Sequence, residues 1–283
     1  MPSSSPPPVA ERARPLLGTL VSIRAEGEAA DLPAAVDAAF VRIAEVHRLM
    51  SFHEPASDLS RINRDAARIP VHVDPRTAAV VRFALAMAKA SHGAFDPTVA
   101  PAAVAAGTLP RPAGAPDPDP AGGWRDVDVD GDSVVSARPV WLDLGGVAKG
   151  YAVDQAIACL QQAGVRQGCV DAGGDLRVFG PETLAVALRS ADRDQIGVVE
   201  LRDAAVASSA GGAMAAHFDG RTRRRLPDGR FASVVAADCM TADALTKVAL
   251  VLGGACGALM SRHAARAHLF DPAGGWTHPG EAA

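Results

Sequence analysis

One segment of the sequence combines glycines with charged side chains in a way that suits anion binding. In LDLGGVAKGYAVD (142–154), a predicted strand ends at Asp143, and Gly145 and Gly146 then turn the chain. A predicted helix follows and places Lys149 in its first turn, where bare backbone N–H groups and the ammonium could bind phosphate. The spacing matches neither the Rossmann fingerprint nor the P-loop. On spacing alone, a tight strand–helix junction with a solvated lysine is therefore favoured.

Two further segments place carboxylates where they could hold a cation. Asp171 and Asp175 flank a Gly-Gly turn in DAGGDLRVFG, which could bind a metal or polar ligand and equally fits a hairpin with charged ends. Asp243 lies in the first turn of a predicted helix over 241–254, where the helix dipole favours a carboxylate and Thr241 is the expected N-cap. As a ligand, Asp243 would suit Mg²⁺ better than a transition metal, because no histidine or cysteine lies at ligand spacing. Helix capping is the alternative role.

Other residues capable of chemistry have less specific patterns. Asp96 precedes a proline in GAFDPTVAP (93–101), which favours an extended turn. His53 and His217 show no metal or triad spacing, and no Gly-x-Ser-x-Gly elbow is present. The four cysteines are expected to be buried small hydrophobic residues. A basic cluster could grip phosphate, although a solvated loop is favoured; it consists of Arg221, Arg223, Arg224 and Arg225.

The composition excludes some classes of protein. The chain of 283 residues carries 28 Lys and Arg against 32 Asp and Glu, a formal net charge of −4, and only 4% of it is aromatic. It therefore lacks the basic face and the stacking platforms of general nucleic-acid binders. No signal peptide is recognised, and no run approaches the about 18–20 apolar residues of a membrane span, so a cytoplasmic protein is predicted. The tails over 1–15 and 271–283 are expected to be disordered and flexible, respectively.

Apolar periodicity and turn residues predict alternating helices and strands along the chain. The Asp130-Gly131 dipeptide between two alternating runs predicts a hairpin. The expected helices cover about 31–50, 76–91, 147–163 and 241–254, with a polar loop over 51–66. The expected strands are 16–26, 71–73, the 124–135 hairpin, 140–146, the pair within 168–180, those within 183–210, and 233–237.

Taken in order, the motifs resemble the ApbE-type FAD:protein FMN transferase family. The resemblance implies an α+β fold of two interlocked α/β halves, with mixed and antiparallel sheets and a flavin cleft between the halves. It also implies one domain over 16–270. The matching segments are LGTLVSI (17–23), MSFHEPASDLSRIN (50–63), GAFDPTVAP (93–101), LDLGGVAKGYAVD (142–154), VDAGGDLRVFG (170–180) and CMTADALTK (239–247).

The family resemblance also implies an activity and its residues. The activity is Mg²⁺-dependent transfer of FMN from FAD to a Ser or Thr hydroxyl of a target protein, with release of AMP. The implied metal ligands are the Gly146 carbonyl, the Asp243 carboxylate and a third group at position 247, and the implied catalytic residues are Asp243 and Lys149. The implied flavin contacts are Leu17, His53, Ala94, Phe95, Asp96, Asp143 and Lys149.

The sequence departs from the family pattern at several positions. Leu17 stands where the family has methionine, and His53 where it has an aromatic residue. Lys247 stands where a threonine ligand is usual, and a lysine ammonium has no lone pair for a metal. Pointing inward, it would replace part of the ion's charge, whereas Thr246 lies one residue early, about 100° around a helix. The stretch over 208–233 also lacks the expected His-x-x-Asp-Pro.

These departures keep a second hypothesis open. The alternative is a flavin-binding protein on the same scaffold that does not transfer FMN, with or without slow FAD hydrolysis. Either hypothesis implies FAD as ligand, and the first adds a flavin-acceptor protein. Neither involves nucleic acid or a membrane span, and neither fixes the oligomeric state.

Overall fold

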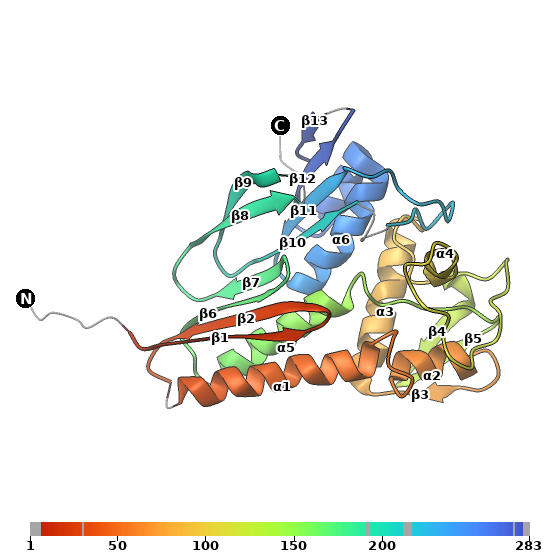
Figure 1. Ribbon diagram of the computed structural model, residues 1–283, viewed down its shortest axis with the longest axis horizontal. Coiled ribbons are helices and arrows are strands. Elements are labelled where there is room, and N and C mark those ends of the chain that lie inside the picture. The colour runs from red at the N-terminus through yellow and green to blue at the C-terminus, as the bar shows by residue number, and fades with distance from the viewer. Residues whose placement is uncertain (1–6, 30, 191–192, 212–216, 274, 280–283) are drawn as a thin grey trace, which may run out of the picture.

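The computed structural model describes residues 7–29, 31–190, 193–211, 217–273 and 275–279. Its centre is an eight-stranded antiparallel sheet in the order β1-β2-β6-β7-β10-β11-β12-β13 (Figure 1). The strands are β1 (Val9–Leu16), β2 (Thr19–Glu26), β6 (Gln167–Ala172), β7 (Asp175–Phe179), β10 (Ala205–Ala210), β11 (Phe231–Ala236), β12 (Arg266–Asp271) and β13 (Gly275–Thr277).

Three helices pack on one face of this sheet and bury the main core: α1 (Leu32–Met50), α5 (Ala148–Gln162) and α6 (Cys239–Leu252). Side chains alternate across a strand, so the other face buries a second, smaller cluster under the hairpin of β8 (Leu184–Ser190) and β9 (Arg193–Leu201). That cluster includes Leu176, Val206 and Leu201. The helices thus cover one face of the sheet, and the hairpin covers the other face at β7, β10 and β11.

The second half of the molecule lies beyond the end of α1 that Figure 1 draws next to α2. It holds a three-stranded sheet in the order β3-β5-β4, with α3 beside it. Its elements are α2 (Asp58–Asp65), β3 (Val71–His72), α3 (Pro75–Ala90), α4 (Ala100–Ala105), the 3₁₀ turn η1 (Trp124–Asp126), β4 (Val127–Asp130) and β5 (Ser133–Ser136); η2 (Gly253–Cys256) and α7 (Gly257–Arg262) follow α6. The expected α+β class with antiparallel sheets is confirmed.

Aspartate side chains cap the N-termini of helices α1 and α6. Asp31 accepts a hydrogen bond from Ala34 N at 2.9 Å and so caps α1, as expected. Helix α6 begins two residues earlier than predicted, because Asp238 rather than Thr241 is its N-cap, accepting from Thr241 N at 2.8 Å. Asp154 of α5 accepts from the next free N–H groups, those of Cys239 and Met240, at 3.0 and 2.9 Å. This carboxylate fixes the start of α6 against α5.

The polar segment 51–66 is not a loop throughout, as the sequence analysis expected, since it contains α2. Ser57 caps this helix by accepting from Ser60 N at 3.0 Å, and Leu59 and Ile62 turn into the core. The two apolar positions three residues apart were the available signal. They were outweighed by the polar residues around them.

The expected strand over 140–146 is also absent, and its backbone groups are satisfied in another way. Leu142 N donates to Asn63 Oδ1 at 2.7 Å, and Asn63 Nδ2 donates to Leu142 O at 2.9 Å. Asp143 N donates to Pro97 O at 2.7 Å. A buried side chain of α2 therefore replaces a neighbouring strand, and the segment carrying Asp143 is held to the second half of the molecule.

Both terminal expectations need correction. Residues 9–15, expected to be disordered, form most of β1 and pair with β2, and the segment after 270 contributes β13 to the same sheet.

The stretch Cys239–Arg262 is long and apolar enough to cross a membrane, contrary to expectation. Half of the most apolar 18 residues in this stretch are buried inside the protein, as in the core helix of a globular domain. The stretch is therefore weak evidence for a membrane span.

The contact between α5 and α6 leaves no room for a side chain at Gly150, whose Cβ would lie 2.3 Å from Cys239 O. We expect Gly150→Ala to lower the free energy of unfolding by about 1–3 kcal/mol, because backbone must shift to admit the methyl group. Urea denaturation measures this. The control is Gly254→Ala, which meets open space and should change stability by less than about 0.5 kcal/mol. Equal effects of the two substitutions would contradict this packing argument.

Candidate functional site

Two adjoining cavities of ≈ 260 and ≈ 420 Å³ lie where the two halves meet. They share Leu109, Asp143 and Gly145 in their walls. Together their volume is in the range of small-molecule sites. All seven residues expected to contact flavin line one or both of them: Leu17, His53, Ala94, Phe95, Asp96, Asp143 and Lys149. Segments from across the chain thus converge on one cleft.

Asp143 lies at the junction of the two cavities. Its Oδ1 accepts from Gly145 N at 2.9 Å, which forms the turn that leads into α5. Burial raises the pKa of this carboxyl, while the Gly145 N–H and the nearby positive groups of His53 and Lys247 oppose the rise. Among the residues that the structure describes, none hydrogen-bonds to its other oxygen, so the carboxylate can accept from a ligand in the cleft.

The turn after α3 supplies one wall. Asp96 accepts from Thr98 N at 2.7 Å and from Thr98 Oγ1 at 2.6 Å, and it forms an ion pair of 3.1 Å with Arg223. Phe95 N donates to Ser91 Oγ at 3.1 Å, which holds the backbone of the turn next to Asp96. The basic cluster is therefore partly used within the protein: Arg223 binds this turn, and its neighbour Arg221 pairs with a carboxylate of its own loop.

The wall of the larger cavity carries two of the positions where the sequence departs from the family. Leu17 adopts a φ of 55° in the tight turn between β1 and β2, next to Gly18. His53 is exposed at the mouth of the larger cavity, and its ring meets the Phe52 ring edge-on at 6.3 Å. An exposed imidazole can stack on a planar ligand. Both residues therefore line the larger cavity.

A buried cluster of charges lies under the cleft, on β7, α5 and α6. Lys149 forms an ion pair with Asp175, and Lys247 forms one with Asp243; both carboxylates are completely buried. Burial and the nearby Asp243 raise the pKa of Asp175 to about 6, against the opposing effect of Lys149. Burial alone would also raise the pKa of Asp243, but the ammonium groups of Lys247 and Lys149 lower it below its usual value.

The expected metal ligands do not come together as a metal site. Lys247 occupies one oxygen of Asp243, and Gly150 N donates to the other at 3.2 Å. The Thr246 hydroxyl is buried and donates to the Asp243 carbonyl at 2.7 Å, so it is turned away from the cavity. Within the described ranges, no group of three or more His, Cys, Asp or Glu side chains could hold a metal ion. This arrangement does not fit a resident Mg²⁺.

His217 is a cleft residue that the sequence analysis set aside. It lines the smaller cavity with Gly146 and Lys247. Burial, and then the positive charge of Lys247, lower its pKa to about 4, so its imidazole is neutral at neutral pH. No sequence pattern pointed to this position, because the residues nearest to His217 in space lie on α5 and α6, far from it along the chain. Of the two roles left open for the Gly-Gly turn after Asp171, the structure shows the hairpin, in which Asp171 accepts from Gly174 N at 2.9 Å.

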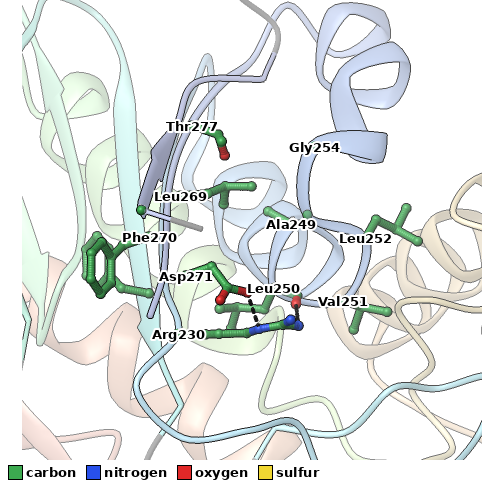
Figure 2. Close-up of a pocket in the computed structure, with 13 residues that line it drawn as sticks. Arg230, Ala249, Leu250, Val251, Leu252, Gly254, Leu269, Phe270, Asp271 and Thr277 are labelled. Atoms are coloured by element: carbon green, nitrogen blue, oxygen red, sulfur yellow. Dashed lines mark hydrogen bonds and ion pairs between the residues drawn. The ribbon is translucent and has the colours of Figure 1, made fainter. Parts of the chain in front are cut away.

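A third cavity, of ≈ 290 Å³, contains none of the predicted site residues (Figure 2). It lies between the end of α6 and strands β11 to β13. Figure 2 shows the Arg230 guanidinium between Asp271, at 2.8 Å, and the Leu250 carbonyl, at 3.3 Å. The guanidinium of Arg230 is thus held by protein groups within this cavity.

Comparison with known proteins agrees with this geometry. The chain is similar to the FAD:protein FMN transferase of Vibrio cholerae, with 29% identity over 235 residues, 74% of this chain and 70% of that protein. It is similar to the same-named protein of Chlamydia pneumoniae, with 27% identity over 260 residues, 83% of this chain and 80% of that protein.

Solved structures show the same fold. The flavin transferase ApbE from Vibrio cholerae superposes with a TM-score of 0.82 at 24% identity, over 96% of this chain and 97% of that one. The ApbE protein of Thermotoga maritima superposes with a TM-score of 0.86 at 24% identity and the same coverage. The sequence model of the ApbE family matches residues 17–270, which run from the β1–β2 turn into β12 and include every cleft residue named above. This chain therefore belongs to the ApbE family.

Proposed function

We propose that this protein transfers the FMN moiety of FAD to a serine or threonine hydroxyl of an acceptor protein and releases AMP. The observation that carries the proposal is the convergence of all seven expected flavin-contacting residues on two adjoining cavities. The curated relatives named above as FAD:protein FMN transferases support it. The chain spans most of their length, so the proposal concerns the whole activity rather than one part of it.

The transfer joins the acceptor oxygen to the FMN phosphorus. The bond between that phosphorus and the bridging oxygen breaks, its electron pair leaves with AMP, and the hydroxyl proton is released. The negative charge of a pyrophosphate needs positive groups nearby, which Lys149 and Lys247 supply from the cavity walls. Gly145 and Gly146 leave the backbone bare there, and Asp143 accepts a hydrogen bond from the ligand. Mg²⁺, which the family resemblance implies, has no role in this proposal because Lys247 occupies Asp243.

The alternative of a flavin-binding protein without transfer is not favoured. Its main support was Lys247 and the missing His-x-x-Asp-Pro stretch over 208–233. In the structure, Lys247 brings a positive charge to the cleft wall, and His217 lines the same cavity. The relatives named above are transferases.

A mass measurement tests the proposal. The protein is incubated with FAD and a pool of synthetic peptides containing Ser or Thr, and AMP release and peptide masses are followed. We expect peptides heavier by one FMN less one water, with one AMP released for each adduct. Replacing the acceptor hydroxyl residues by alanine, or FAD by FMN, should abolish the product. Tight FAD binding with neither adduct nor AMP would leave the flavin-binding alternative.

A further inference from the structure

A side chain of the protein itself supplies the positive charge next to Asp243. One oxygen of this fully buried carboxylate binds the Lys247 ammonium, and the other accepts from Gly150 N at 3.2 Å. Residues four apart on a helix lie on the same face, so α6 alone holds the pair together. Lys247 lines the smaller cavity beside Gly146, and its side chain is 17% exposed. A ligand entering this cavity meets an ammonium group rather than a free carboxylate.

Thr246 is not placed to act as a metal ligand in place of residue 247. Its hydroxyl donates to the Asp243 carbonyl at 2.7 Å and lies 2.8 Å from Ser209 Oγ of β10. The residue is completely buried and lines neither cavity. To ligate a metal beside Asp243, it would have to give up both contacts and turn about 100° around α6.

The charges of the buried cluster balance without a metal ion. Two carboxylates, Asp175 and Asp243, face two ammonium groups, Lys149 and Lys247. With a threonine at 247, the cluster would hold one negative charge in excess, and burying an unbalanced charge is costly. A bound cation would offset that excess. The lysine therefore supplies from within the chain the charge that a metal ion would bring.

We propose that Lys247 takes the place of a divalent metal ion in this protein: its ammonium binds the pyrophosphate of FAD, and FAD binding requires no divalent cation. The proposal rests on the proposed function, which supplies FAD as the ligand. A lysine ammonium is a compact point charge with three donors and binds phosphate oxygens. The bare backbone at Gly146 and the neutral His217 line the same cavity. Of the two carboxylates in its wall, Asp96 is paired with Arg223 and Asp143 lies at the junction with the larger cavity.

The first test titrates the protein with Mn²⁺ alone and follows free Mn²⁺ by its electron paramagnetic resonance signal. Wild type should show no saturable site below millimolar Mn²⁺. Lys247→Thr restores an oxygen ligand and frees Asp243, so it should bind one Mn²⁺ at least about tenfold more tightly than wild type. Lys247→Met frees Asp243 without adding a ligand and serves as the matched control. Mn²⁺ should also raise the melting temperature of Lys247→Thr but not of wild type.

The second test measures FAD affinity by flavin fluorescence, in EDTA and in MgCl₂. For wild type and for Lys247→Arg, which keeps the charge, the dissociation constant should change less than about twofold between the two buffers. For Lys247→Thr, FAD should bind at least about tenfold more weakly in EDTA than in MgCl₂. The fluorescence test therefore measures whether FAD binding needs a positive charge at position 247 or a metal ion, and it does not depend on turnover.

The outcomes separate this proposal from the proposed function. A wild-type protein that binds one Mn²⁺ tightly, or that loses FAD on addition of EDTA, overturns the role of Lys247. FAD binding in EDTA without any transfer to an acceptor contradicts the proposed function and leaves the role of Lys247 standing. If Lys247→Thr does not fold, the wild-type and Lys247→Arg measurements still decide the question.

Discussion

We expect Lys149→Met to lower the free energy of unfolding by about 3–5 kcal/mol, because it strands a buried charge. Asp175 on β7 is completely buried, and one of its oxygens is paired with the Lys149 ammonium. Its other oxygen, Oδ1, has no hydrogen-bond partner among the residues that the structure describes. Without Lys149, this carboxylate would keep the repulsion of the nearby Asp243 against only the weaker attraction of Lys247. Urea denaturation at pH 7 measures the loss.

A second substitution separates the stranded charge from the loss of lysine packing. Lys149→Met combined with Asp175→Asn removes both charges and keeps nearly the same volume, so most of the lost stability should return. The double variant should lie within about 1–2 kcal/mol of wild type. A double variant as unstable as the single one would show that the ion pair is not the cause.

The pH dependence of the single variant has a definite sign. Burial already raises the pKa of Asp175 to about 6, well above the 3.8 of an unperturbed carboxyl, and the loss of Lys149 removes an opposing effect. Between pH 7 and 5 the folded variant therefore takes up a proton that the unfolded chain does not. Its stability deficit should shrink as the pH falls through this range. The double variant, with Asn at 175, should show no such change.

The fold could be predicted wherever a segment carries its own periodicity. Helices α1 and α5 and the hairpin at Asp130-Gly131 follow from local patterns, and their bounds agree within a few residues. The segment over 140–146 was predicted wrongly because its partner is the Asn63 side chain, 79 residues away in sequence. No local pattern distinguishes an apolar run that pairs with a strand from one that pairs with a buried amide.

The site shows the same division between what is local and what depends on packing. Ordered motifs were enough to name the residues that line the cleft, from Leu17 to Lys149. The pairs were not visible in the motifs: Lys149 and Asp175 lie 26 positions apart. Asp243 and Lys247 have the spacing of a helical ion pair, which the sequence shows. The burial of the Asp243 carboxylate is not visible in the sequence, because it depends on the close approach of α5 to α6 at Gly150. His217 was missed for the same reason.

Asp143→Ala should weaken FAD binding about 10- to 100-fold and reduce flavin transfer at least as much. Asp143 faces both cavities and is the carboxylate best placed to accept from a flavin N–H, and a hydrogen bond to a charged group contributes about 1.5–3 kcal/mol. The substitution also removes the acceptor for Gly145 N, at 2.9 Å, so the turn into α5 loosens. Flavin fluorescence titration measures the affinity.

Two controls separate the contact with flavin from the effect on the turn. Asp143→Asn keeps an oxygen for Gly145 N but loses the charge, so it should fold like wild type and still bind FAD more weakly. Asp171→Ala breaks a similar turn, in which the carboxylate accepts from Gly174 N at 2.9 Å, but Asp171 lines neither cavity, so FAD affinity should not change. If Asp143→Asn binds FAD as tightly as wild type while Asp143→Ala does not, the carboxylate serves the turn and not the flavin. If both variants lose affinity while Asp171→Ala keeps it, the Asp143 charge itself recognises the ligand.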